Sequence, residues 1–381
     1  MKIDNPSNKT SLKELFFLFL KLGLTSFGGP VAHIAIMENE IVKKRNWLTE
    51  QHFLDLIGAT NLIPGPNSTE MAIHIGQERA GFKGLIVAGV CFILPAVIIT
   101  AIFAVLYKEY GRLPQLHPFL YGISPAVIAI ILAAIYPLAR KSLKTLELVL
   151  VGVVTLILSL FGLNEIYVMF GAGFFMLALT AIRNNKTNTL KSISSVTFLH
   201  ISGTGIFSTT NLSIFLTFLK IGSILYGSGY VLFAILDSEL VAKGIISRQQ
   251  LIDAIAVGQF TPGPVFSSVT FIGYQINSFT GAIVATIGIF LPSFIFVALL
   301  NPFVRKMRNS KLFSVFLDAV NVASIAIIVA VCYQIGKDTI SNWRTIVIAI
   351  TSLIAVFRFK KINSAIVVIG GAILGYILIL F

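Results

Sequence analysis

The chain has 381 residues, of which 56% are hydrophobic and only 12% are charged. Soluble domains carry about 25% charged residues, so this composition excludes an ordinary soluble enzyme, a disordered chain and a disulfide scaffold. It indicates an integral membrane protein. The formal net charge of +13 fits a membrane protein whose loop lysines and arginines fix its orientation, and it suits an anionic substrate. Because zinc-finger spacing and an aromatic RNA-binding signature are missing, no nucleic-acid partner is predicted.

Twelve apolar segments follow one another, six on each side of a polar stretch rich in Ser, Thr and Asn. The first six cover residues 15–37, 53–75, 85–106, 119–138, 146–163 and 166–182. The second six cover residues 214–236, 251–276, 282–303, 313–335, 345–357 and 362–381. The predicted domains are therefore an N-terminal repeat over 1–182, a linker over 183–211 and a C-terminal repeat over 212–381. The first segment shows no signal-peptide cleavage site and is predicted to stay in the mature protein.

The two halves share sequence as well as length. FLKLG at 19–23 returns as FLKIG at 218–222, and PGP at 64–66 returns at 262–264. FILPA at 92–96 returns as IFLPS at 289–293, and AIILAAIY at 129–136 returns as AIIVAVCY at 326–333. Because the offset stays between 197 and 199 residues, the pattern predicts a tandem duplication.

Loop charges predict that the two repeats have opposite orientations. In the first half, the loops at 77–84 and 140–145 carry five Lys or Arg, and those at 107–118 and 163–164 carry two. In the second half the bias is reversed, with seven in the loops at 305–311 and 358–361 and two in those at 276–280 and 337–344. Cytoplasmic loops are the positive ones, so equivalent loops face opposite sides, as in transporters built from inverted repeats.

The fold class expected is an all-α polytopic membrane protein with two tandem repeats of inverted topology. Inversion needs an odd number of crossings in each half. The sequence therefore predicts about ten crossings plus two re-entrant or broken helices, with both termini outward and the linker residues Arg183, Lys186 and Lys191 cytoplasmic.

The two Pro-Gly-Pro motifs are the first candidate site. Each proline removes a backbone donor and disfavours helix in the residue before it. A new half-helix that starts after the second proline would point its free N–H groups at the break, which favours an anion. The alternative is a simple proline kink. The candidate binding residues are Pro64, Gly65, Pro66, Asn67, Ser68 and Thr69 in the first half and Pro262, Gly263, Pro264, Ser267 and Ser268 in the second. Alanine at either central glycine is expected to leave folding intact, since alanine favours helix by about 1 kcal/mol.

Glycine turns and intramembrane charges complete the list of candidates. Gly28 and Gly29 in TSFGGP correspond to Gly227 and Gly229 in LYGSGY. These glycines predict either close helix packing or unwound backbone that lines a pathway.

Lys21 and its equivalent Lys220 lie in apolar runs, where an ionisable group is costly and indicates function unless it snorkels to headgroups. Asp55 and Asp253, which follow predicted N-caps at Thr49 and Ser247, are candidates for pairing with these lysines or for carrying protons. Glu70 has no acidic equivalent and is a candidate for ion coupling or for helix capping.

Enzyme signatures are missing from the sequence. It contains no HExxH, GxSxG or P-loop motif, and its histidines lack ligand spacing, so no catalytic residue, metal or cofactor is predicted. Cys91 and Cys332 lie in apolar runs and are predicted to be core residues. A membrane-embedded enzyme and a membrane scaffold without transport remain alternatives to a transporter.

These motifs together resemble the chromate ion transporter family in its long, two-domain form. The resemblance lies in FLKLGLTSFGGPVAHI at 19–34 with NLIPGPNSTEMAIHIG at 61–76, and in FLKIGSILYGSGYVL at 218–232 with GQFTPGPVFSSVTFIGYQ at 258–275. The second copy departs from the family by reading YGSG and by having Ile245 and Ile246 where a Trp is expected, which argues against a strictly symmetric site.

The resemblance implies export of chromate across a prokaryotic plasma membrane, which gives chromate resistance. Residues and spacing alone predict only an anion transporter. Its predicted partners are the anion and the lipid bilayer, and a homodimer is one possible assembly. Sulfate is a tetrahedral dianion of similar size, so a sulfate or other oxyanion transporter is the alternative.

Overall fold

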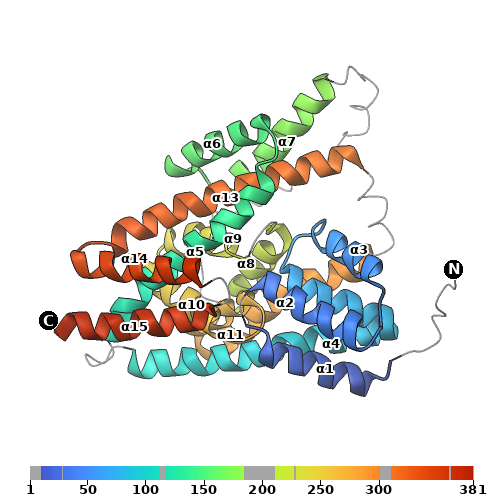
Figure 1. The fold of residues 1–381 in the computed structure, drawn as a ribbon, viewed down its shortest axis with the longest axis horizontal. Coiled ribbons are helices and arrows are strands. Elements are labelled where there is room, and N and C mark those ends of the chain that lie inside the picture. The colour runs from blue at the N-terminus through green and yellow to red at the C-terminus, as the bar shows by residue number, and fades with distance from the viewer. Residues whose placement is uncertain are drawn as a thin grey trace.

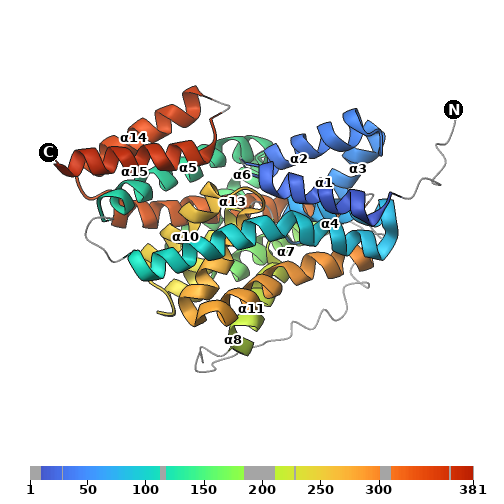
Figure 2. The ribbon, with the colours of Figure 1, turned by 90° about the horizontal axis from the view of Figure 1, so that it is seen from below.

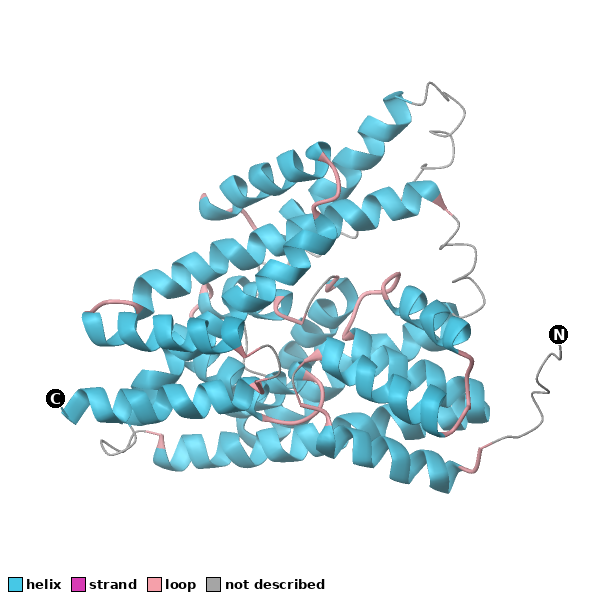
Figure 3. Ribbon diagram, in the orientation of Figure 1, coloured by secondary structure: helices cyan, strands magenta, loops and turns pink. Residues whose placement is uncertain are grey.

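The computed structural model describes residues 10–27, 29–111, 117–183, 211–226, 229–300, 310–359 and 362–380, and in this part all regular structure is helical (Figures 1 and 3). Repeat 1 contains α1 (Leu12–Thr25), α2 (Pro30–Glu38), η1 (Asn39–Lys44), α3 (Glu50–Thr60), α4 (Asn67–Tyr110), α5 (His117–Ser142), α6 (Leu146–Leu160) and α7 (Glu165–Arg183). Repeat 2 contains α8 (Asn211–Ile224), α9 (Val231–Leu236), η3 (Asp237–Val241), α10 (Arg248–Phe260), η4 (Val265–Ser267), α11 (Ser268–Leu300), α13 (Lys311–Thr339), α14 (Trp343–Arg358) and α15 (Ser364–Leu380).

Five helices of the described chain are long and apolar enough to cross a bilayer. They cover Asn67–Tyr110, Pro118–Ser142, Glu165–Arg183, Val265–Leu299 and Leu312–Thr339. Large apolar side chains are exposed along them, as expected for helices that face lipid rather than water. The prediction of an all-α polytopic membrane protein made of two tandem repeats is confirmed.

Helix α4 is a hairpin rather than one straight helix. At Ala80 and Gly81 the backbone leaves the helical region, and Gly81 has a φ of +62°. Gly76 and Gly84 then pack so closely that a Cβ on either would overlap the other's carbonyl. A short half-helix over 67–79 therefore turns back into a long helix over 82–110. Helix α11 repeats this design, with its turn at Asn277 and Ser278 and its close pair at Gly273 and Gly281.

One arginine gathers three chain segments at the turn of this first hairpin. Arg79 donates from Nε to Thr10 Oγ1 (2.8 Å), just before α1, and from Nη1 to the carbonyl of Trp47 (3.4 Å), just after η1. Next to it, His52 Nε2 near the start of α3 lies 2.7 Å from Glu78 Oε2. The segment from α1 to η1 therefore starts and ends at one face, and so does the segment formed by α3 and the half-helix over 67–79. These segments are two re-entrant pairs. The sequence predicted only the second pair.

The hairpin turn of repeat 2 lies at the opposite face. Lys108, near the far end of the long helix over 82–110, donates to Ser278 Oγ (3.0 Å). A helix of this length is about 40 Å long, so the turns at Gly81 and Ser278 are separated by roughly the thickness of a membrane. Asn277 also bonds to Asn211 at the start of α8 (2.8 Å). Repeat 2 therefore enters from the side opposite to repeat 1, and the prediction of inverted repeats is confirmed.

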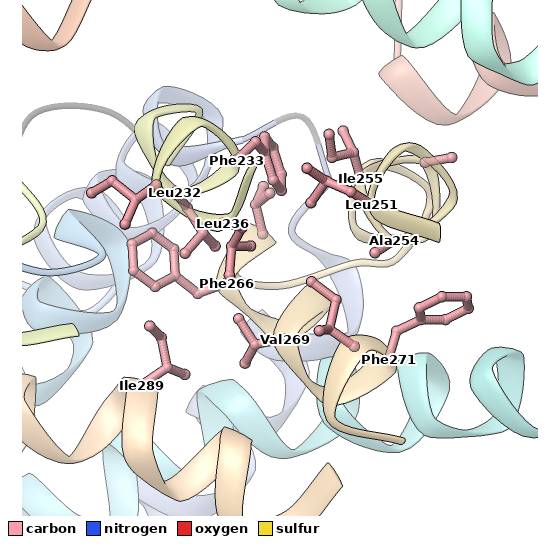
Figure 4. Close-up of a cluster of buried hydrophobic side chains, with 14 of the residues drawn as sticks. Leu232, Phe233, Leu236, Leu251, Ala254, Ile255, Phe266, Val269, Phe271 and Ile289 are labelled. Atoms are coloured by element: carbon pink, nitrogen blue, oxygen red, sulfur yellow. The ribbon is translucent and has the colours of Figure 1, made fainter. Parts of the chain in front are cut away.

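The repeats exchange their last helices. Helices α6 and α7 of repeat 1 pack against α13 of repeat 2, whereas α14 and α15 of repeat 2 pack against α5 of repeat 1. Helices α4 and α11 pack against each other near the middle (Figure 2). Such reciprocal contacts are what a two-fold relation between equivalent surfaces produces. Within repeat 2, apolar side chains from α9, α10, η4 and α11 converge in a buried cluster (Figure 4).

Basic residues collect at the face where repeat 1 enters, which we call the positive face. It carries Arg79, Lys83, Arg140 and Lys144, and the ion pair between Lys144 and Asp318 (2.8 Å) joins the end of α5 to the start of α13 there. The positive-inside rule assigns this face to the cytoplasm.

The two ends of the described chain lie at different faces (Figure 1). The start of α1 lies at the positive face because Thr10 bonds to Arg79, and the positive-inside rule then argues against the expected outward N-terminus. The physical reason is that two re-entrant pairs, rather than one, return the chain to the face at which it started. The end of α15 lies at the opposite face, where Tyr376 stacks on Phe119 at a centroid distance of 4.6 Å.

This arrangement predicts the labelling of single cysteines in intact cells. In a background with Cys91 and Cys332 replaced by alanine, an impermeant maleimide should label Lys337→Cys from outside but leave Arg140→Cys unlabelled until the membrane is opened. Arg140 and Lys337 are exposed near helix ends, and Lys83→Cys, at an exposed position by the hairpin turn of α4, serves as the control that should behave like Arg140→Cys. Labelling of Arg140→Cys and Lys337→Cys from the same side would contradict the inverted arrangement.

Candidate functional site

Four breaks in the helices are joined by two equivalent backbone hydrogen bonds. The N–H of Gly65 donates to the carbonyl of Leu225 (2.8 Å), and the N–H of Gly263 donates to the carbonyl of Ser26 (2.8 Å). Each Pro-Gly-Pro motif is thereby tied to the end of the first helix of the other repeat. Backbone groups freed inside a membrane are tolerated only when protein or a water-filled cavity satisfies them, and here the other repeat satisfies them.

Contacts within each repeat close this arrangement. His33 of α2 places Nδ1 3.2 Å from Ser68 Oγ at the start of α4. In repeat 2, a Cβ on Gly229 would lie 3.7 Å from the ring of Phe266 in η4. Thr100 of the long α4 helix donates to Ser267 Oγ of repeat 2 (3.3 Å). The glycine turns and the Pro-Gly-Pro motifs therefore belong to one central structure, which we call the break cluster. We define it as residues 26–27, 29, 61–70, 225–226, 229–230 and 261–268.

A new helix starts after each Pro-Gly-Pro motif, as predicted. Helix α4 begins at Asn67 directly after Pro66, and η4 with α11 follows Pro264. Neither start has a side-chain cap in the described structure. The first N–H groups of a helix lack partners within the helix and carry the positive end of its dipole. Two uncapped helix starts are therefore built into the break cluster.

Buried hydroxyl groups in the break cluster have no hydrogen-bond partner within the described chain. They are those of Ser26, Thr69 and Ser268, all with 0% exposure. Buried polar atoms are paired in the great majority of cases, so unpaired ones require an explanation. A ligand that accepts hydrogen bonds would supply it.

Two further polar side chains of the break cluster, Asn67 and Glu70, have partners in the described chain. Asn67 donates to Asn61 Oδ1 (2.7 Å), so its side chain closes the loop over Pro-Gly-Pro. Glu70 is fully buried, and its Oε1 accepts from Ser293 Oγ of α11 (3.4 Å) while its Oε2 has no partner in the described chain. The break cluster contains no lysine or arginine.

The two candidate lysines lie outside the break cluster, in ion pairs. Lys21 Nζ lies 3.5 Å from Glu40 Oε1, and Lys220 Nζ lies 2.5 Å from Glu239 Oε1. Each glutamate has further cationic partners on its own segment: Lys44 (2.8 Å) and Arg45 for Glu40, and Lys243 (2.6 Å) for Glu239. The suggested aspartate partners are therefore not the ones found. The glutamates were missed, although they share the 199-residue offset of the lysines.

The two candidate aspartates are in structural settings. Thr49 and Ser247 cap α3 and α10 as predicted, and Ser247 forms a complete capping box with Gln250. Asp253 accepts from the hydroxyl of Tyr107 (2.6 Å) and from Gln249 (2.9 Å), which joins α10 to the long α4 helix. Asp55 accepts from Gln51 (3.4 Å) one turn earlier.

The glycines of the break cluster are not helical. Gly65 has a φ of +137° and Gly263 a φ of +89°. A Cβ on Gly65 would overlap Glu70 Oε1 and lie 2.5 Å from Ser293 Oγ, and one on Gly263 would lie 3.0 Å from Ala96 Cβ. The expectation that alanine is harmless to folding is therefore wrong, because it assumed helical backbone. Gly29 has a φ of +83° and precedes Pro30 at the start of α2. Gly28, Gly227, and Lys186 and Lys191 of the linker lie outside the described residues.

The described part of the chain offers no metal site. It contains no group of three or more His, Cys, Asp or Glu side chains that are placed to hold a metal ion. The chemistry that the break cluster offers is hydrogen-bond donation from N–H and O–H groups.

Inverted repeats whose broken helices meet near the middle of the membrane define the chain as a secondary-transporter type of membrane protein. Comparison with known families shows to which transporter family the chain belongs. The model of the family described as chromate transporter matches residues 13–177 and, a second time, residues 212–376. The chain belongs to the chromate transporter family, and the resemblance found in the sequence is confirmed.

Curated relatives match almost the full length. The chain is 30% identical to a probable chromate transport protein of Synechococcus elongatus over 96% of this chain and 95% of that protein. It is 28% identical to a chromate transport protein of Cupriavidus metallidurans (96% and 93%) and 26% identical to an uncharacterized transporter of Methanocaldococcus jannaschii (99% and 97%). No solved structure matches the chain.

The positive φ of both central glycines predicts a loss of stability on substitution. Gly65→Ala should lower the free energy of unfolding by more than about 2 kcal/mol, because left-handed strain costs about 1–2 kcal/mol per residue and the Glu70–Ser293 contact must also move. Gly263→Ala should cost about 1–2 kcal/mol. Thermal unfolding in detergent measures both. Gly336→Ala, at a helical glycine with open space around it, is the control and should be neutral or stabilising.

The ion pairs predict unequal effects of the two lysines on stability. Lys220→Met leaves the buried Glu239 with Lys243 alone, whereas Lys21→Met leaves Glu40 with both Lys44 and Arg45. We expect Lys220→Met to cost about 1 kcal/mol and Lys21→Met less, measured as melting temperature against the exposed control Lys337→Met. A larger loss for Lys21→Met would contradict the pairing described.

Proposed function

We propose that this protein exports chromate across the plasma membrane of a prokaryote and binds the anion at the break cluster. Supporting observations are the family, the names of the relatives and the chemistry of the cluster. Chromate is a tetrahedral dianion with only acceptor oxygens, and the break cluster offers two uncapped helix starts and three buried hydroxyls without partners. That combination of donors is the single observation that carries the proposal.

In this proposal Lys21 and Lys220 attract the anion electrostatically but do not bind it. Their side chains are 59% and 50% exposed for Lys21 and Lys220, and each precedes the end of its helix by only a few residues. A positive charge near the approach to the cluster raises the local concentration of an anion. Binding itself falls to N–H and O–H groups, which is how anions are held at helix starts elsewhere.

Export is the direction that the membrane potential favours for a dianion. With the positive face in the cytoplasm and an interior-negative potential, moving one charge outward gains about 2.3 kcal/mol per 100 mV. The same donors suit sulfate, which is therefore the competitor to include in every assay.

The hydroxyl groups provide the test. Reconstituted protein should exchange labelled chromate across liposomes, and Ser26→Ala, Thr69→Val and Ser268→Ala should each raise the half-saturating chromate concentration about tenfold or more. A hydrogen bond to a charged group contributes about 1.5–3 kcal/mol, and 1.4 kcal/mol is tenfold in affinity.

Ser159→Ala is the matched control for these variants. Its hydroxyl is also buried without a partner in the described chain, but it lies on α6 outside the break cluster. If Ser159→Ala impairs exchange as strongly as the three cluster variants, or if none of the three has an effect, the site is not at the break cluster.

A further inference from the structure

Three titratable side chains follow one another along the short half-helix over 67–79. Glu70, His74 and Glu78 are spaced four residues apart, so they lie on the same side of the helix, with about 6 Å of rise from one to the next. Glu70 belongs to the break cluster, and Glu78 lies at the positive face beside His52. This row, which we call the titratable column, connects the break cluster with the positive face.

Two members of the column, His74 and Glu70, have polar atoms that no ordinary structural pairing explains. His74 is 1% exposed, and neither of its ring nitrogens has a hydrogen-bond partner in the described chain. Glu70 is 0% exposed with Oε2 unpartnered. A buried carboxylate without a compensating charge costs several kcal/mol, so a side chain retained there for packing alone would be apolar.

Repeat 2 shows that the hairpin forms without such a column. Gly263 follows Gly65 by 198 residues and Gly273 follows Gly76 by 197, so two alignments of α11 on α4 are possible. Under either alignment the equivalents of the column are not titratable: Ser267 or Ser268, Phe271 or Ile272, and Gln275 or Ile276. Glutamine also replaces His52, at Gln250. The column is therefore an addition to repeat 1 and opens toward the positive face only.

Glu70 connects the column to the anion. A Cβ on Gly65 would overlap Glu70 Oε1, so the carboxyl group lies directly against the Pro-Gly-Pro backbone. An ionised Glu70 would repel a dianion bound there, whereas a protonated Glu70 would not and has an O–H to donate. The other titratable groups that face it are His33 on α2, through Ser68, and Tyr226 after α8. From α11 the contact is Ser293, which does not titrate in this range.

We propose that Glu70, His74 and Glu78 form a proton path and couple oxyanion transport to proton movement between the break cluster and the positive face. This inference rests on the proposed function. Glu70 takes up a proton from water on the side opposite to the positive face, while the site is open there, and holds it while the anion is bound. When the anion leaves, the carboxyl passes that proton to one ring nitrogen of His74, the other ring nitrogen releases a proton to Glu78 or His52, and these exchange it with water. In each step one O–H or N–H bond breaks at the donor and one forms at the acceptor, so no oxidant, reductant or other co-reactant is needed.

The test uses full-length protein in liposomes that contain chromate and the pH indicator pyranine. Two fluxes are measured: exchange of labelled for unlabelled chromate at equal pH, which needs no net proton movement, and net chromate movement driven by a pH gradient. Wild type should perform both, with a pyranine signal that accompanies the net flux.

His74→Phe, which installs the residue that repeat 2 carries in register with the Gly76–Gly84 pair, should retain exchange. It should lose at least tenfold of the pH-driven flux and of the pyranine signal. Glu147→Gln is the control: this carboxylate pairs with Arg183 outside the column, and its removal should leave both fluxes unchanged.

Several results would overturn the inference. One is a His74→Phe variant with the wild-type ratio of protons to chromate, and another is net chromate flux in wild type without a pyranine signal. If His74→Phe does not fold, the double variant Glu78→Gln/His52→Gln decides, because both side chains lie at the surface; unchanged coupling in it rejects the path. A wild-type protein that exchanges no chromate at all would overturn the proposed function itself, and the proton path with it.

Discussion

Two backbone hydrogen bonds, from Gly65 to Leu225 and from Gly263 to Ser26, are the constraint on which the rest of the structure depends. Each repeat interrupts its helices twice, and an interrupted helix inside a membrane leaves polar backbone exposed to hydrocarbon. In the described chain, the N–H of the central glycine in each Pro-Gly-Pro motif is satisfied by the other repeat. Because each break is satisfied by the other repeat, the two halves must be opposed and in contact, which fixes the inverted arrangement and the reciprocal packing of α5 with α14 and α15 and of α13 with α6 and α7.

The sequence correctly predicted the features that depend on residue types and on their spacing. The duplication, the inversion, the helix starts after Pro66 and Pro264 and the caps at Thr49 and Ser247 all have a local signature. The other features either have no local signature in the sequence or have a signature that the sequence analysis did not recognise. A backbone hydrogen bond between Gly65 and Leu225 leaves no trace in residue type. The α1–η1 pair contains no proline break as conspicuous as Pro-Gly-Pro, so the sequence predicted one re-entrant pair instead of two. The partners of the lysines were readable, since Glu40 and Glu239 repeat at the lysines' own offset.

Symmetry at the level of the backbone contrasts with asymmetry in the chemistry. The Lys–Glu pairs, the close glycine contacts and the cross-repeat hydrogen bonds occur twice. Glu70, His74 and the Glu78–His52 contact occur once, in repeat 1. A symmetric scaffold treats the two sides of a membrane alike, whereas transport in one direction requires a difference between them. The single set of titratable groups is one such difference, and it lies on the side that the basic loops assign to the cytoplasm.

The most direct measurement for this account is an experimental structure of the full chain with chromate bound, in which the anomalous scattering of chromium locates the anion. The account predicts a chromium site within hydrogen-bond reach of backbone or hydroxyl groups from both repeats, between the helix starts at Asn67 and Val265. A chromium site contacted by one repeat alone, or one at Lys21 or Lys220 away from the breaks, would contradict it.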